Sequence, residues 1–471
     1  MSFINYLNSF LEIRITRVIQ KIHAKATMLG AFFLILPIKS FSVQKPLHLE
    51  NAVKPAVFSL SMVMMHDVLS PTGAARYFAY CMLGAYEIVS GNDIETFALK
   101  KNINQYPKIN FTDVKGYDRD IAAVLCIYES GKSLLPSGSM MQKNEDDFLN
   151  FLTKSKITKQ TITASLLVAQ DISRQIVAWS KTDGYSKLSS RLRYTPAKGE
   201  GYWYPTPPAY MEPVDPHWNT LRTFFIDSAA QFTPERPTHF SKDSTSAFYK
   251  IAHDVYSATK NATSEQKEIA AFWDCNPFAL VTAGHMSLGF KKISPGAHWM
   301  NITGIACQQA KLDMKAVITA HTLVALSLHD AFISCWDEKY RSNRIRPETF
   351  INRNIDVSWQ PMLQTPPFPE YPSGHSVAST AVAVILSGLL GNNFSYTDDT
   401  ELMFELKPRK FKSFIQAADE AAISRFYGGI HYMDAIENGQ KQGKQIGESI
   451  VRKLGLSQSS LKTNEKDVAG K

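Results

Sequence analysis

Helical periodicity dominates the pattern of apolar and polar residues along this chain. Apolar side chains recur at the three- and four-residue spacing of a helix in many segments, whereas the alternation typical of a half-buried strand is scarce. The pattern therefore predicts an all-α fold. The predicted helices are Thr72–Val89, Asp118–Leu134, Thr161–Ser180, Ser244–Thr259, Ala306–Asp337, Gly374–Leu390, Lys412–Tyr427 and His431–Leu454.

Proline and aromatic residues are dense between the third and fourth of these helices. The segment Tyr202–Pro237 opens with the run Tyr202–Pro208, in which prolines follow closely on aromatic side chains. Proline lacks a backbone donor and restricts the residue before it, so no helix is expected here. We predict an extended segment that wraps over the helices and serves mainly in packing.

The two ends of the chain differ from its middle. Residues 1–42 carry basic side chains followed by the apolar run Ala26–Ile38, which is shorter than the roughly 20 residues of a membrane span. We predict a cleaved signal peptide and a periplasmic or secreted protein, with an uncleaved membrane anchor as the alternative. Residues 43–238 are expected to form an N-terminal helical half, residues 239–456 a C-terminal catalytic bundle, and residues 457–471 a disordered polar tail.

Composition and charge narrow the class of protein. Of the 471 residues, 44% are apolar and 20% charged, as is typical of a large globular chain. The formal net charge of +8 includes no long block of like charges, so we expect no nucleic-acid partner, although small anions would be attracted. The 5 cysteines are widely separated and lack C-x-x-C spacing, so most are expected to be buried apolar residues, with one disulfide left open.

Three segments in the last third of the chain place cationic or imidazole groups at predicted helix ends, where unpaired backbone N–H groups favour anions. The first segment follows the predicted helix that contains Trp336. It carries Lys339, a point charge, and Arg346, a planar fork of donors, and Pro347 is expected to end any helix there. Alone, this segment is more typical of a solvated basic helix end.

The second segment, Ser373–His375, opens an apolar helix. The backbone N–H groups of Ser373 and Gly374 can donate to an anion, and the glycine lets the backbone approach it closely. His375 would then lie beside the anion, where an imidazole can act as a general acid or base. An N-cap followed by an exposed histidine is the ordinary alternative.

The third segment joins two predicted helices through Gly428 and Gly429. Arg425 offers a second guanidinium fork, and the glycine break can turn His431 back toward the same point. An imidazole nitrogen placed there can ligate a metal or attack phosphorus. A purely structural histidine is again the ordinary alternative.

Taken in order, Lys-x6-Arg-Pro, Pro-Ser-Gly-His and Ser-Arg-x5-His resemble the motifs of the superfamily that contains the vanadium-dependent haloperoxidases and the type 2 phosphatidic acid phosphatases. The motifs cover Lys339–His431. The resemblance to the bacterial haloperoxidase-type members extends to Asp330–Lys339, Thr206–Pro208 and Ala74–Arg76. The resemblance implies a fold of helical bundles, with the oxyanion at one end of the C-terminal bundle.

The resemblance also assigns a role to each residue of the three motifs. It implies that vanadate is the cofactor, that phosphate can occupy the same site, and that neither haem nor flavin is needed. Hydrogen peroxide and a halide would be the substrates and hypohalous acid the product. The residues implied to hold the equatorial oxygens are Lys339, Arg346, Ser373, Gly374 and Arg425, with His431 as the axial ligand of the vanadium, His375 on the apical oxygen, and Lys339, His375 and His431 as the catalytic residues.

The phosphatase branch of the superfamily offers the alternative activity. There, His431 would attack a phosphate ester and form a phosphohistidine, while His375 would protonate the leaving alcohol. Trp336 and Phe368 resemble aromatic positions that line the halide pocket of chloroperoxidases, and the chain is longer than the compact secreted phosphatases of the superfamily. We therefore predict a haloperoxidase, with the halide and the formation of a homodimer left open.

One position departs from the family pattern. The pattern usually has an aspartate four residues after the last histidine, but this chain has Ala435 there and Asp434 one residue earlier. We predict that Asp434 orients the His431 ring from a neighbouring helical face, and that Asp274 supports Arg425.

Overall fold

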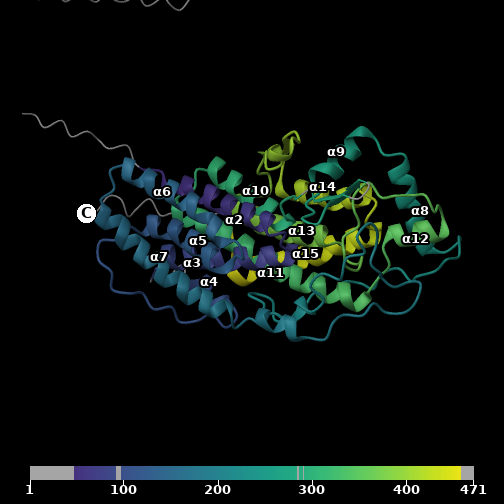
Figure 1. Cartoon of the computed structure of the whole chain (residues 1–471), viewed down its shortest axis with the longest axis horizontal. Helices are drawn as coiled ribbons and strands as arrows, with labels where there is room; N and C mark the ends of the chain where they lie inside the picture. Colours follow the sequence, from purple (N-terminus) through teal and green to yellow (C-terminus); the bar gives the residue numbers. More distant parts are fainter. Residues whose placement is uncertain (1–46, 92–96, 284–285, 290, 458–471) are drawn as a thin grey trace, which may run out of the picture. The chain divides into compact units, whose positions relative to one another are not determined.

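The computed structural model describes residues 47–91, 97–283, 286–289 and 291–457, and helices make up most of them (Figure 1). The predicted signal peptide over residues 1–42 and the predicted tail beyond Ser457 lie outside the described residues. The described helices belong to one compact unit. The boundary that the sequence suggests between residues 238 and 239 therefore stays a prediction.

Each helix is bounded as follows. The α-helices are α2 Val53–His66, α3 Pro71–Ser90, α4 Phe97–Asn102, α5 Arg119–Leu134, α6 Gln142–Lys154, α7 Lys159–Ser180, α8 Ala247–Lys260, α9 Ser264–Phe272, α10 Pro295–Gln309, α11 Met314–Ser342, α12 Pro347–Asn354, α13 Gly374–Leu390, α14 Phe414–Tyr427 and α15 Met433–Leu454. Short 3-10 helices are η1 Leu49–Ala52, η2 Gly138–Met141, η3 Tyr185–Ser190, η4 Trp218–Thr220 and η5 Leu402–Phe404. Two antiparallel hairpins pair β1 Leu280–Ala283 with β2 Met286–Gly289, and β3 Tyr396–Asp398 with β4 Arg409–Phe411.

The all-α prediction is confirmed, and all but one of the predicted helices form with ends shifted by at most 3 residues. The exception is Ala306–Asp337, which the structure divides between α10 and α11. Lys311 breaks the helix because its φ of 52° lies in the left-handed region. Asp313 then caps the new helix, since its side chain accepts a hydrogen bond from the Ala316 N–H at 2.8 Å.

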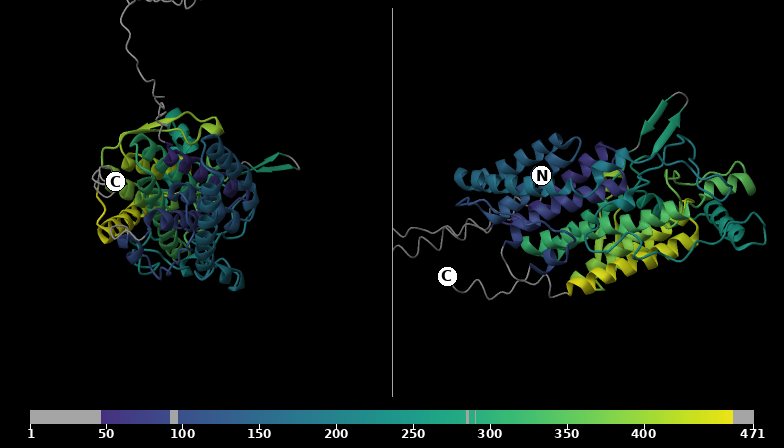
Figure 2. Two further views of the ribbon diagram at one scale, coloured as in Figure 1. Left: turned by 90° about the vertical axis from the view of Figure 1, so that its left-hand side faces the viewer. Right: turned by 90° about the horizontal axis from the view of Figure 1, so that it is seen from below.

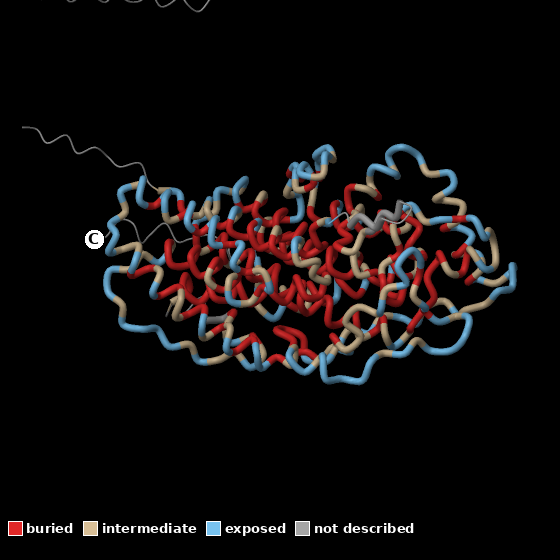
Figure 3. Tube along the Cα trace, viewed as in Figure 1, coloured by how far each residue is buried: buried red, intermediate tan, exposed pale blue. Residues whose placement is uncertain are grey.

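The central helix α11 joins two groups of helices. On one side it packs against α3, which in turn packs against α5 and α7, and these helices run from purple to blue in Figures 1 and 2. On the other side it packs against α13, which also contacts α14 and α15, drawn in green to yellow. One continuous apolar cluster runs through both groups, and Figure 3 shows the buried stretches gathered along these helices.

The helix α11 is long and apolar enough to cross a membrane by length and composition alone. However, 94% of its most apolar stretch is buried against the rest of the protein. An apolar helix surrounded by other helices is typical of the core of a large bundle. Its C-terminal end delivers the first motif to the interior.

Close packing of α13 against α15 fixes the start of α13. A Cβ atom added at Gly439 of α15 would lie 3.0 Å from the backbone oxygen of Ser373, and one added at Gly443 would collide with the backbone oxygen of Val377. Glycine is therefore needed at both positions for the two helix backbones to approach this closely. The second motif is held at the first turn of α13 by this contact.

The proline-rich segment Tyr202–Pro237 is irregular apart from η4, as predicted. It is anchored by Asp330 of α11, whose buried carboxylate accepts the backbone N–H groups of three successive residues, Phe224, Phe225 and Ile226, at 2.6–3.1 Å. Packing also contributes, because Trp203 and Trp218 are each only 1% exposed. All of the cysteines are buried and unpaired, so the open question of a disulfide is answered in favour of free thiols.

Candidate active site

The three cationic side chains of the predicted motifs converge in the protein interior from three helices. Lys339 lies in the last turn of α11, Arg346 is the N-cap residue of α12, and Arg425 lies in the last turn of α14. Their exposed fractions are 0%, 0% and 2%, which excludes a solvated basic helix end. Two local predictions were wrong, because α11 continues past Lys339 to Ser342, and Pro347 begins α12 rather than ending a helix.

Backbone carbonyl groups surround the ammonium group of Lys339. Its Nζ donates hydrogen bonds to the carbonyl oxygens of Pro369 at 3.1 Å, Glu370 at 3.1 Å and Pro372 at 2.5 Å. Burial, with a contribution from the positive charge of Arg346, lowers the pKa of Lys339 to about 7. The charge of this side chain therefore changes near neutral pH, and a bound anion would hold it protonated.

One terminal nitrogen of the Arg346 guanidinium group, Nη2, makes no hydrogen bond to the described residues. Its Nε donates to the carbonyl oxygen of Phe368 at 3.0 Å, and its Nη1 donates to that of Ile430 at 2.9 Å. Nη2 is buried, and none of the described residues accepts a hydrogen bond from it. Burial lowers the pKa of Arg346 to about 10, so the side chain remains charged at neutral pH. A buried, charged donor without an acceptor indicates that a ligand belongs beside it.

Glu370, which the sequence analysis did not single out, holds the His431 ring. Its Oε1 lies 2.8 Å from Nδ1 of His431 and accepts the backbone N–H of Tyr432 at 3.0 Å. Because Nδ1 donates to this carboxylate, Nε2 of His431 keeps its lone pair, and Nη1 of Arg346 points to it from 3.3 Å. This tautomer leaves Nε2 able to ligate a metal or to attack phosphorus.

The prediction that Asp434 orients His431 was wrong. Asp434 instead forms a two-pronged ion pair with Arg344, in which Nη1 and Nη2 of the arginine lie 2.7 and 2.8 Å from the two carboxylate oxygens. Nε of Arg344 donates to Oε2 of Glu370 at 2.6 Å. Asp434 therefore reaches the histidine only indirectly, through Arg344 and Glu370.

Arg425 is held by backbone oxygens rather than by Asp274. Its Nη2 donates to the carbonyl oxygen of Trp273 at 2.6 Å, and its Nε donates to the Ser424 hydroxyl at 2.9 Å. Asp274 forms its ion pair with Lys292, at 3.2 Å. Burial lowers the pKa of Arg425 and the charge of Asp274 partly offsets this, so the predicted support is electrostatic and involves no direct hydrogen bond.

The first turn of α13 differs from the prediction in one respect. The backbone N–H of Ser373 is not available to an anion, because it donates to the carbonyl oxygen of Ala435 at 3.0 Å. The Ser373 hydroxyl remains available as a donor, since it accepts from the Ser376 N–H at 3.3 Å. A Cβ atom at Gly374 would make ordinary contacts, 3.5 Å from the Trp336 ring and 3.9 Å from Cε of Lys339, and would occupy the space next to these two side chains.

His375 lies half-buried at the start of α13, beside the arginine and histidine of the third motif. Nε2 of His375 is buried, and no described residue hydrogen-bonds to it. Burial and then the positive charge of Arg425 lower the pKa of His375 well below its usual range. Burial and then the charge of Arg346 do the same for His431. Both imidazoles are therefore neutral at neutral pH and offer lone pairs rather than positive charge.

A cavity of about 40 Å³ lies beside these groups. The cavity is lined by Gly374, His375, Arg425 and His431, together with the aromatic rings of Trp336 and Phe368. The centroids of the two rings lie 5.0 Å apart. The two predicted halide-pocket residues thus lie at the same cavity as residues of the second and third motifs. Lys339 of the first motif lies next to them, with its Nζ 5.1 Å from the centre of the Phe368 ring.

This set of groups fits a small tetrahedral oxyanion such as vanadate or phosphate. The buried cations Lys339, Arg346 and Arg425 outnumber the nearby carboxylates of Glu370 and Asp274, so the cavity is electropositive. Nη2 of Arg346 lacks an acceptor, and the Gly374 N–H lies in the unpaired first turn of a helix. An oxyanion would supply the acceptors that these donors lack.

Two residues of the site were missed from the sequence. Glu370 lies three residues before Ser373, and Arg344 lies two residues before Arg346, so both are close to recognised motifs. The available signal was an acidic residue in a proline-rich run next to the second motif. The sequence alone does not show that this run folds across the imidazole of the third motif.

Comparisons with known proteins agree with this geometry. A family model described as the second helical-bundle domain of VCPO matches residues 319–457, which contain all three motifs. The crystal structure described as that of the first bacterial vanadium-dependent iodoperoxidase is 42% identical, and the alignment covers 88% of this chain and 99% of that one, with a TM-score of 0.80. No match was found among curated proteins.

More distant structures share the fold alone. A holo-type bacterial vanadium-dependent chloroperoxidase is 13% identical, with a TM-score of 0.60 and coverage of 88% of this chain and 96% of that one. The apo-type structure of a bacterial vanadium-dependent chloroperoxidase is 12% identical, with a TM-score of 0.60 and coverage of 84% and 95%. Helical bundles of this kind thus recur where little sequence identity remains.

Proposed function

Because the chain belongs to the vanadium-dependent haloperoxidase family, we propose that it binds vanadate beside His431 and oxidises a halide with hydrogen peroxide, with iodide as the preferred halide. The observation that carries the proposal is the neutral His431 ring, whose Nδ1 is fixed by Glu370 and whose Nε2 faces three buried cations. Iodide is proposed because the relative that shares 42% identity over nearly its whole length is an iodoperoxidase.

Every polar group that would hold vanadate comes from the three motifs. Nε2 of His431 would be the ligand to the metal, and the positive groups and donors would bind the oxygens. These are Lys339, Arg346, Arg425, the Ser373 hydroxyl and the Gly374 N–H. When bound, vanadate supplies a Lewis-acid centre that activates hydrogen peroxide without a change in the oxidation state of the metal.

His375 is proposed as the proton acceptor of the reaction. A neutral imidazole whose Nε2 is buried and has no partner can take a proton from hydrogen peroxide as the peroxide binds. The same nitrogen can return the proton as the second oxygen leaves as water. In sum, hydrogen peroxide, halide and one proton give hypohalous acid and water, so the halide loses two electrons and the peroxide gains them.

Trp336 and Phe368 are proposed to form the halide-binding wall. Their rings line the cavity beside Gly374, and Nζ of Lys339 lies 5.7 Å from the centre of the Trp336 ring. A large polarisable anion such as iodide loses little hydration energy against aromatic surface, while the cation compensates its charge. We also propose, on the sequence of residues 1–42, that the enzyme acts outside the cytoplasm.

The proposal is tested by reconstitution. The protein is dialysed into phosphate-free buffer, and oxidation of iodide, bromide and chloride by hydrogen peroxide is measured with and without orthovanadate. We expect activity that requires orthovanadate and saturates with it, with the highest kcat/KM for iodide. Arg346→Lys should raise the orthovanadate concentration for half-maximal activity by at least about tenfold, because lysine lacks the guanidinium fork.

The same protein preparation serves for the control variant and for the assay of the competing phosphatase activity. Arg353→Lys, at an exposed position on α12, should leave the orthovanadate requirement unchanged. Hydrolysis of a phosphate ester that orthovanadate inhibits, without peroxide-dependent halide oxidation, would overturn the proposal. It would favour the phosphatase alternative, in which Nε2 of His431 attacks phosphorus.

A further inference from the structure

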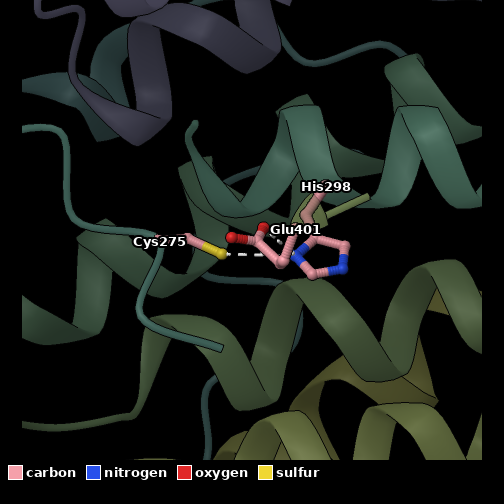
Figure 4. Close-up of side chains that lie close together, drawn as sticks. All are labelled: Cys275, His298 and Glu401. Atoms are coloured by element: carbon pink, nitrogen blue, oxygen red, sulfur yellow. Dashed lines mark hydrogen bonds and ion pairs between the residues drawn. The ribbon is translucent and has the colours of Figure 1, made fainter. Parts of the chain in front are cut away.

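Next to the cavity, which Cys275 helps to line, three side chains from separate parts of the chain point toward one another (Figure 4). Cys275 follows α9, His298 lies in α10, and Glu401 precedes η5. Their exposed fractions are 3%, 0% and 1%. One ligand-type atom from each, the Sγ, an imidazole nitrogen and a carboxylate oxygen, lie within 4.8 Å of one another. We propose that these three side chains bind a zinc ion.

The distances between the atoms suit a tetrahedral metal. Nδ1 of His298 lies 3.1 Å from Oε1 of Glu401 and 3.5 Å from Sγ of Cys275. Zinc–ligand distances of about 2.0–2.3 Å at tetrahedral angles place nitrogen and oxygen ligands about 3.4 Å apart, and nitrogen and sulfur ligands about 3.6 Å apart. Both distances to Nδ1 of His298 therefore lie within a few tenths of an ångström of those in a zinc site, and the sulfur and the carboxylate oxygen, which lie within 4.8 Å of each other, would approach to about 3.6 Å around the ion.

A second observation points to a ligand between these side chains. Oε1 of Glu401 is buried and, although it lies 3.1 Å from the imidazole of His298, no described residue makes a hydrogen bond of acceptable geometry to it. A buried carboxylate oxygen without a hydrogen bond is costly, and a divalent cation would compensate it. The combination of thiolate, imidazole and carboxylate is typical of zinc sites and poorly suited to magnesium or calcium.

The far side of His298 has the partners that a metal-binding imidazole usually has. Its Nε2 lies 2.8 Å from Oδ2 of Asp398 and 2.7 Å from the Thr400 hydroxyl. A carboxylate on the second ring nitrogen fixes the orientation of the ring, so that Nδ1 faces the ion. Trp273 stacks on the same ring, with centroids 4.5 Å apart and planes inclined by 18°.

The location gives the ion a structural role. It would tie the segment after α9 to α10 and to the loop before η5. That segment includes Trp273, whose carbonyl oxygen accepts the hydrogen bond from Arg425. Zinc would therefore stabilise one wall of the cavity, and its site shares no ligand with the proposed oxyanion site.

Metal content and cobalt binding test the proposal. Untagged full-length protein, purified without chelators, is supplied with zinc, desalted and analysed for metal. We expect about one zinc ion per chain in the natural protein and in Cys307→Ser, which removes another buried thiol on the helix that carries His298. Cys275→Ser should retain less than about a tenth of that zinc. Cobalt added to the zinc-free protein should produce a thiolate-to-cobalt charge-transfer band that Cys275→Ser abolishes.

A second variant keeps the test decisive if Cys275→Ser fails to fold. Asp398→Asn keeps all three ligands but weakens the support of His298, and we expect it to raise the dissociation constant for zinc by about 10- to 100-fold. Absence of zinc and of the cobalt band in the natural protein would overturn the proposal, as would equal zinc in Cys275→Ser. The assay contains no vanadate, peroxide or halide, so its failure leaves the proposed haloperoxidase activity untouched.

Discussion

Replacing Glu370 by glutamine tests how the site controls the imidazole of His431. Every group that contacts this carboxylate is a donor, because Oε1 accepts from His431 and Tyr432, and Oε2 accepts from Arg344. A glutamine has an acceptor at only one end, so its NH2 group must face donors on one side or the other. No rotation of the amide satisfies both sets of partners.

Each orientation of the amide has a distinct cost. If the NH2 group faces Arg344, two donors meet, and the net loss of a charge-assisted hydrogen bond is about 1.5–3 kcal/mol. If it faces the imidazole, His431 must carry its proton on Nε2 instead, directly opposite Nη1 of Arg346, which lies only 3.3 Å away. The lone pair that would ligate vanadium is then lost.

We therefore expect Glu370→Gln to raise the dissociation constant for orthovanadate by about 10- to 100-fold. This corresponds to about 1.4–2.8 kcal/mol of binding free energy. The assay is titration of the phosphate-free protein with orthovanadate, read out by halide oxidation at saturating peroxide. Circular dichroism and the urea midpoint check that the variant is folded.

Asp434→Asn is the matched control for this experiment. It also replaces a carboxylate by an amide, but at a residue that contacts Arg344 and not His431. The hydrogen bond between Glu370 and His431 stays in place. We expect a change in orthovanadate affinity of less than about threefold. A larger loss in Asp434→Asn than in Glu370→Gln would refute the assignment of Glu370 as the residue that orients the ring.

Three further predictions concern single groups at the cavity. Lys339→Gln replaces a side chain that can carry a positive charge by one that is neutral at every pH. The natural protein should therefore bind orthovanadate more tightly than the variant, and this difference should shrink as pH rises above about 7, where Lys339 loses its proton. A ratio of dissociation constants that stays constant from about pH 6 to about pH 9 would contradict this. His375→Ala should lower kcat by about 10²- to 10⁴-fold and change orthovanadate affinity by less than tenfold, and a kcat within tenfold of the natural value would exclude His375 as the proton acceptor. Phe368→Ala should lower the free energy of unfolding in urea by about 3–5 kcal/mol and raise KM for the halide, whereas a loss below about 1 kcal/mol would show that the ring is not part of the packed core.

The fold was largely predictable because its helices carry clear local signals. Gly374–Leu390 was predicted with its correct ends, since an N-cap serine, a glycine and an unbroken apolar run coincide there. The break between α10 and α11 was missed because Lys311 adopts a left-handed conformation that no glycine or proline announces. The N-cap Asp313 was the signal that could have revealed it.

The sequence predicted the site residues that belong to local motifs. It did not predict those whose role depends on a contact with a distant part of the chain. Lys339, Arg346 and His431 carry recognisable spacing, and the structure brings them together. The sequence could not show that the Ser373 N–H is taken by Ala435, because that contact depends on the packing of α15 against α13. The link from Glu370 to His431 spans 61 residues and likewise appears only in the folded chain.

The run of residues 366–372 before α13 explains how Lys339 and Arg346 meet their hydrogen-bonding requirements without pairing with a carboxylate. Proline contributes a carbonyl oxygen but no N–H, so a run of prolines exposes acceptors that no neighbouring backbone donor uses. The ammonium group of Lys339 accordingly contacts the carbonyl oxygens of Pro369 and Pro372, and Nε of Arg346 contacts that of Phe368. Carbonyl dipoles satisfy the hydrogen-bonding requirement of a cation without cancelling its charge. An aspartate or glutamate at the same place would satisfy that requirement but would also cancel the charge. The positive potential therefore remains for an anionic ligand, and the carboxylate of Glu370 is directed to the imidazole and to Arg344 rather than to Lys339, Arg346 or Arg425.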